Sequence, residues 1–116
     1  MKVKRIVPNV AASDTGQANA FYGDLLGLEL LMDLGWIRTY GPSSEMAIQV
    51  SVATEGGSGA PVPDISIEVD DIDEVLARAK KSKVPIEYGP KIEPWGVRRF
   101  YVRDPFGKLV NILQHD

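Results

Sequence analysis

Hydrophobic and polar residues alternate along most of the apolar stretches of the chain, and this period of two predicts β-strands. The predicted strands cover residues 3–10, 28–33, 36–40, 46–52, 64–69 and 84–88, followed by a two-stranded hairpin over residues 98–113. Two other stretches repeat their apolar residues every three to four positions, which predicts amphipathic helices. Each helix has an N-cap residue with a capping-box partner: Asp14 with Gln17, and Asp71 with Glu74. The predicted element order is therefore βαβββ, occurring twice.

The final hairpin has the clearest turn signal, the sequence Asp104-Pro105-Phe106-Gly107. Proline presets φ at the second turn position, and glycine can adopt positive φ. Pairing across this turn predicts an apolar core face made of Phe100, Val102, Val110 and Ile112. The opposite face mixes polar and apolar side chains: Arg99, Tyr101, Leu109, Asn111 and Leu113. This second face suits the wall of a pocket, or the half-wet side of an ordinary antiparallel sheet.

The fold class expected from this pattern is α+β. The two βαβββ modules cover residues 1–53 and 64–116 of one domain, residues 1–116, and the Gly- and Pro-rich residues 54–63 connect them. Each module has one helix, which covers one face of its sheet. The other face must be covered by the partner module, by a second subunit or by a ligand.

The composition is that of an ordinary globular protein, with 25% charged and 44% hydrophobic residues. A net charge of −3 argues against a nucleic-acid partner, because nucleic acids select basic surfaces. The absence of cysteine excludes disulfides and thiolate metal sites. The basic start of the chain lacks the apolar core of a signal peptide, and no segment is long enough to span a membrane. We therefore expect a cytoplasmic protein with no membrane partner.

Three motifs resemble the vicinal oxygen chelate superfamily of glyoxalases, bleomycin-resistance proteins and dioxygenases. They are Phe21-Tyr22 followed by the residues LLGL at 25–28, the Pro94-Trp95-Gly96 loop, and the residues YVRDPFG at 101–107. The segments PNV at 8–10 and DLGW at 33–36 are most similar to the bleomycin-resistance branch. This resemblance implies that the two modules form a curved mixed sheet around a central cleft, and that the protein is a homodimer.

The resemblance also predicts that the metal site of the superfamily is absent. Metal-using members hold a divalent ion with one His or Glu from each of four strands, and the matching positions are Arg5, Gln49, Asp64 and Asn111. A guanidinium repels a cation, and side-chain amides are poor ligands for zinc, nickel or iron. The single histidine, His115, lies outside the motif and is expected to be an exposed tail residue. We therefore expect no metal and no other cofactor, with Arg5 paired to Asp64 and two amides in place of the ion.

These polar groups are either structural or orient a ligand in an otherwise apolar cavity. Tyr101 matches a substrate-contacting tyrosine of the fosfomycin-resistance enzymes, and Asn111 is expected to contact the ligand beside it. Trp36 and Trp95 offer aromatic faces to a flat or cationic ligand. The remaining candidate ligand contacts are polar or charged: Arg5, Gln49, Asp64, Glu68 and Arg99.

Three function classes follow. The first is a metal-independent protein that binds and sequesters a small molecule, as bleomycin-resistance proteins do, with no catalytic residues. The second is a glyoxalase-like lyase or isomerase, or a dioxygenase-type enzyme, with an atypical metal site at Asp64 or with acid–base chemistry by Tyr101, Asp64 or Glu68. The third is an interaction domain with a vestigial pocket. The first is the leading hypothesis because the fold motifs are intact while the ligand set is missing.

Overall fold

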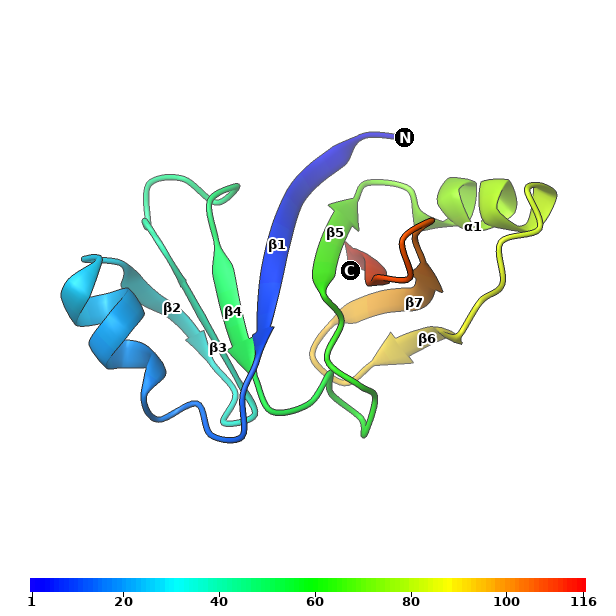
Figure 1. The fold of residues 1–116 in the computed structure, drawn as a ribbon. Coiled ribbons are helices and arrows are strands. Elements are labelled where there is room, and N and C mark those ends of the chain that lie inside the picture. Colours follow the sequence, from blue (N-terminus) through cyan, green and yellow to red (C-terminus); the bar gives the residue numbers. More distant parts are fainter. The chain divides into compact units, whose positions relative to one another are not determined.

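The structure, a computed structural model, describes all residues 1–116 and contains eight strands and two helices (Figure 1). The strands are β1 (Val3–Ala11), β2 (Glu29–Asp33), β3 (Ile37–Gly41), β4 (Val50–Ala53), β5 (Ile65–Val69), β6 (Tyr88–Glu93), β7 (Val97–Arg103) and β8 (Leu109–His115). The helical segments are η1 (Asn19–Leu25) and α1 (Ile72–Lys81). The predicted α+β class and the repeated βαβββ order are confirmed.

The chain divides into two compact units that share β1. The C-terminal unit contains Pro63–Asp116 together with Met1–Ile6, and the N-terminal unit contains Val7–Val62. Neither helix has the length and apolar character that crossing a membrane requires.

In the C-terminal unit the strand order is β1-β5-β8-β7-β6. Strand β5 runs parallel to β8, whereas β7 pairs antiparallel with both β8 and β6. Helix α1 covers one face of this sheet and buries Ile72 and Leu76 against Phe100, Val110 and Ile112. The predicted core face of the hairpin is thereby confirmed.

The turn between β7 and β8 forms as its sequence predicts. The N–H of Asp104 donates to the Lys108 carbonyl at 3.0 Å, and Gly107 has φ of +78°. The Asp104 carboxylate accepts from the backbone N–H groups of Phe106 and Lys108. Helix α1 also begins as predicted, because the Asp71 carboxylate accepts from the Glu74 N–H at 3.1 Å.

In the N-terminal unit the strand order is β2-β3-β4-β1. The segment η1 is a wide, π-type helix in which the Leu26 N–H donates to the Phe21 carbonyl five residues back. It packs over a core of Ala18, Tyr40 and Val52. Gly27 follows the C-cap residue Leu26 with φ of +73°, the left-handed conformation that glycine commonly adopts just after a helix.

Three predicted elements need correction. The first helix begins at Asn19 rather than near Asp14, because the Asp14 carboxylate accepts from the nearby Gly16 N–H and caps no helix. Strand β4 begins at Val50, since backbone hydrogen bonds fold residues 42–48 into successive turns. The sixth strand covers Tyr88–Glu93 rather than residues 84–88, so that Gly89 and Pro90 lie within it. Proline is tolerated there because β6 is an edge strand.

Candidate functional site

The candidate site lies on the face of the C-terminal sheet opposite α1, which we call the polar face. The hairpin contributes five buried residues to it, namely Arg99, Tyr101, Leu109, Asn111 and Leu113. The guanidinium, the phenol and the amide on this face are all buried. Because burying an unpaired polar group costs free energy, each of them needs a hydrogen-bond or ion-pair partner.

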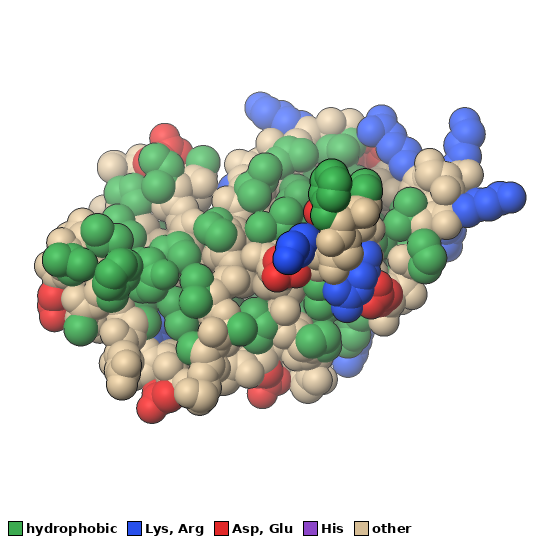
Figure 2. All heavy atoms as spheres, viewed as in Figure 1, with side chains coloured by type: hydrophobic (Ala, Val, Ile, Leu, Met, Phe, Trp, Pro, Cys, Tyr) green, Lys and Arg blue, Asp and Glu red, His purple; other side chains and the backbone are tan.

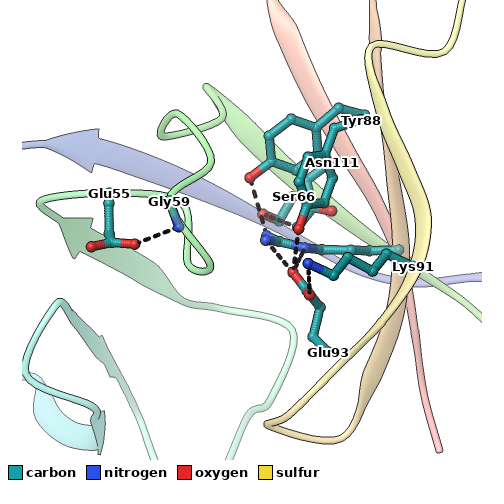
Figure 3. Close-up of polar contacts among 9 residues, drawn as sticks. Glu55, Gly59, Ser66, Tyr88, Lys91, Glu93 and Asn111 are labelled. Carbon is teal, nitrogen blue, oxygen red and sulfur yellow. Dashed lines mark hydrogen bonds and ion pairs between the residues drawn. The ribbon is translucent and has the colours of Figure 1, made fainter.

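Arg99 is paired with Glu93 across β7 and β6. The Arg99 Nη2 and Nε atoms lie 2.5 and 2.8 Å from the Glu93 Oε2 atom. The side chains are 4% and 0% exposed, so the pair is withdrawn from water. The phenol of Tyr88 donates to the same carboxylate oxygen at 2.9 Å, and the Lys91 ammonium lies 3.8 Å from the other oxygen. Figure 3 shows these groups converging on Glu93.

Three aromatic rings surround the Arg99 guanidinium. Its central carbon lies 5.0 Å from the ring centres of Tyr88 and Trp95 and 5.1 Å from that of Tyr101. These are cation–π distances, and they are most favourable where water is excluded. The guanidinium also donates to the Tyr101 phenol at 3.1 Å. Glu93, Arg99 and the three rings therefore form one connected cluster, which we call the Arg99 cluster.

Burial raises the pKa of the Tyr101 phenol above its ordinary value, and the nearby Arg99 charge opposes this shift only in part. Tyr101 is therefore a neutral phenol at physiological pH. A neutral phenol can bind a ligand by donating or accepting a hydrogen bond, but it is a poor general base.

Asn111 lies beside Tyr101 on the paired strand β8. Its Nδ2 atom donates to the Ser66 hydroxyl at 3.1 Å, whereas its Oδ1 atom is buried and has no hydrogen-bond partner. An unpaired buried carbonyl oxygen costs free energy that a bound donor would recover. Figure 3 labels the Asn111 amide together with its hydrogen-bond partner Ser66.

Glu68, on β5, forms a second charged group on the polar face. Its carboxylate lies 2.5 Å from Arg5 Nε and 2.8 Å from His115 Nδ1, and Lys4 lies 4.0 Å away. The prediction that Arg5 pairs with Asp64 is therefore wrong. Lys2 and Asp70 exchange hydrogen bonds, which places Arg5 near the Glu68 end of β5. Asp64 lies about 13 Å further along at the usual rise per residue.

The other predicted site residues have different surroundings. The Asp64 carboxylate accepts from the Leu109 N–H at 2.8 Å and thus holds the start of β8. His115 is exposed, as predicted, but it is the last residue of β8 and contacts Glu68, so it is not a free tail residue. Trp36, half-buried, and Gln49, buried, belong to the N-terminal unit.

Sequence reasoning missed Tyr88, Lys91 and Glu93. All three lie on β6. Gly89-Pro90 and Pro94 predicted a loop for the segment that holds Lys91 and Glu93, and Tyr88 was predicted as the last residue of the preceding strand. The register between β6 and β7 shifts between Tyr88 and Lys91, which also hides the alternation of side chains. One feature of the sequence could have indicated this pairing: Glu93 and Arg99 carry opposite charges on either side of the short Pro-Trp-Gly turn.

The polar face does not fit a divalent metal. Of the positions matched to ligands on this unit, Arg5 is a cation bound to Glu68, Asp64 is engaged by a backbone N–H, and Asn111 offers one amide oxygen. No three His, Asp or Glu side chains of the chain are grouped as metal ligands. We therefore derive no chemistry through a metal ion.

A family model described as the Glyoxalase/Bleomycin resistance protein/Dioxygenase superfamily matches residues 2–112. The chain belongs to this superfamily. No curated protein matches the sequence.

Several solved structures share the fold of this chain. A hypothetical protein from Bacillus halodurans C-125 superposes with a TM-score of 0.78 at 17% identity, over 100% of this chain and 96% of that chain. Methylmalonyl-CoA epimerase from Streptomyces coelicolor gives 0.71 at 19% identity, with 98% and 99% covered. A superfamily member from Vibrio splendidus 12B01 gives 0.69 at 19% identity, with 97% and 99% covered. At these identities the similarity establishes the fold alone.

Proposed function

We propose that this protein binds a small molecule on the polar face without a metal ion, in the manner of the bleomycin-resistance branch. The observation that carries the proposal is the unpaired Oδ1 atom of Asn111, a buried acceptor beside a phenol and an aromatic-lined guanidinium. A ligand with an N–H or O–H group would satisfy this acceptor and recover its desolvation cost.

The charges of the polar face favour a neutral or weakly acidic ligand. Glu68 is compensated by Arg5, Lys4 and His115, and Glu93 by Arg99 and Lys91. Neither carboxylate is left to attract a cationic ligand. We therefore propose a planar, aromatic or heteroaromatic ligand with a hydrogen-bond donor, since Tyr101 and Trp95 supply aromatic surface.

Binding is favoured over catalysis because the candidate acids and bases are engaged. Tyr101 keeps its proton, Asp64 accepts a backbone hydrogen bond, and Glu68 is held between basic groups. A general base needs an accessible lone pair matched in pKa to the working pH. Turnover of methylglyoxal–glutathione adducts, lost on Asp64→Asn, would establish the enzymatic alternative instead.

The test is the small-molecule content of the untagged protein purified under native conditions. We expect the wild-type protein to release one dominant small molecule on denaturation, detected by mass spectrometry, and Asn111→Leu to release none. Asn19→Leu, an exposed asparagine on η1, is the matched control and should retain the molecule. Equal retention by both variants would contradict a role for Asn111.

The proposal includes a homodimer in the cytoplasm, as the superfamily resemblance implies. Exposed apolar side chains of β2, Leu30 and Met32, offer surface for a second copy. A monomeric mass by light scattering at micromolar concentration would contradict the dimer while leaving the binding proposal intact.

A further inference from the structure

A cavity of about 400 Å³ lies in the N-terminal unit, between η1 and the strands β1 and β4. It is on the helix-covered side of its sheet, formed entirely by residues of that unit, and is separate from the polar face described above. Its size falls in the range of small-molecule pockets. A π-type helix forms one wall, and such turns occur frequently at functional sites.

The chemistry of the lining is asymmetric. Its apolar and aromatic members are Val10, Ala12, Ala18, Phe21, Tyr22 and Val52. Its polar members are Ser13, Asp14 and Gln17, so that Asp14 carries the only charge. Arg38, which donates to the Thr15 carbonyl next to Asp14, is not part of the lining, and its Nε atom lies 3.3 Å from the Asp33 carboxylate. The cavity therefore combines an apolar body with a single negative charge.

We infer that this cavity is a second binding site, which takes a compact organic cation: an ammonium group on an aromatic or aliphatic body. The ammonium would pair with Asp14, whose Oδ1 accepts from the Gly16 N–H and whose Oδ2 remains for a ligand. An anion finds no positive side chain in the lining and is repelled by the same carboxylate.

The aromatic side chains provide the second half of the recognition. Phe21 and Tyr22 meet edge to face at 5.0 Å, and Tyr22 stacks on the buried Tyr40 at 5.8 Å. The buried Tyr40 ring therefore holds the Tyr22 ring in place, whereas the Phe21 side chain is 52% exposed. Figure 2 shows hydrophobic side chains gathered at the left of the view, around η1, which extends the apolar surface available to the body of the ligand.

The test uses 2-phenylethylammonium as the probe, titrated at millimolar concentration into the ¹⁵N-labelled full chain. We expect amide shifts confined to residues 10–22 and 52. Asp14→Asn should weaken binding about threefold, since Asp14 is exposed and water screens its pairing with the ammonium. Asp24→Asn removes an exposed acid of η1 outside the lining and should bind normally. The neutral analogue 2-phenylethanol should bind more weakly than the ammonium.

A second variant tests the aromatic wall of the cavity and leaves Asp14 unchanged. Phe21→Ala should weaken the probe, whereas Leu25→Ala, 68% exposed on the same helix, should not. Equal affinity of wild type and Asp14→Asn, shifts centred on Arg99 and Asn111, or no shifts at all would each overturn the site. Asn111→Leu should leave the probe's binding unchanged, so this inference and the proposed function fail independently.

Discussion

Arg99 and Glu93 form an ion pair in which both side chains are almost completely excluded from water and the closest atoms lie 2.5 Å apart. Such a pair is held by geometry and by additional hydrogen bonds, because removing two charges from water is costly. The phenols of Tyr88 and Tyr101 supply those hydrogen bonds. This pair positions the aromatic rings that the proposed ligand would contact.

Glu93→Gln should destabilise the protein by about 3–5 kcal/mol, because it leaves the buried Arg99 charge uncompensated. Urea unfolding followed by circular dichroism measures the change. The matched control is Glu87→Gln, which breaks the exposed Arg103–Glu87 pair at 2.9 Å and should cost less than about 1 kcal/mol. Similar losses for the two variants would show that the buried pair has no special role.

The pairing of Arg5 with Glu68, rather than with Asp64, predicts a selective energetic coupling. A double-mutant cycle with Arg5→Met and Glu68→Gln should give an interaction energy of about 0.5–3 kcal/mol. The corresponding cycle with Arg5→Met and Asp64→Asn should be additive within about 0.5 kcal/mol. The opposite pattern would place Arg5 at the other end of β5.

Tyr101 predicts a pH effect of known sign. Burial raises the pKa of its phenol in the folded state, so the folded protein keeps a proton that the unfolded chain loses above about pH 10. The contribution of Tyr101 to the free energy of unfolding should therefore be constant below about pH 10 and should fall as the pH rises beyond it. Tyr101→Phe should show a shallower fall, measured by urea unfolding at a series of alkaline pH values. Parallel curves would mean that Tyr101 ionises equally in both states.

Tyr40 provides a contrast, because its buried hydroxyl has no hydrogen-bond partner. Tyr40→Phe removes an unsatisfied polar group and should raise the free energy of unfolding by about 1 kcal/mol. Tyr101→Phe at neutral pH removes a hydrogen bond to Arg99 and should lower it by a similar amount. A loss in both variants would indicate that Tyr40 has a partner.

The parts of the fold that follow from local rules could be predicted from the sequence. The Asp104–Gly107 turn and the Asp71 cap each depend on a few adjacent residues, and both form as expected. The opposite faces of the hairpin follow from alternation alone. Strand β6 was misplaced because its Gly and Pro residues signal a loop, whereas an edge strand accepts them.

The candidate site was only partly predictable. Alternation identified Arg99, Tyr101 and Asn111 as one surface, but the partner of each is set by tertiary register. Arg5 illustrates this, since its carboxylate partner depends on where β1 pairs along β5. Glu93 was missed because its strand was taken for a loop, and with it the centre of the Arg99 cluster.

The most direct test of metal-independent binding is native mass spectrometry of the untagged protein before and after dialysis against a chelator. If binding is independent of metal, a small-molecule adduct persists unchanged in mass and occupancy, and elemental analysis finds far less than one equivalent of divalent metal. Loss of the adduct on chelation, with recovery when a divalent metal is returned, would contradict it.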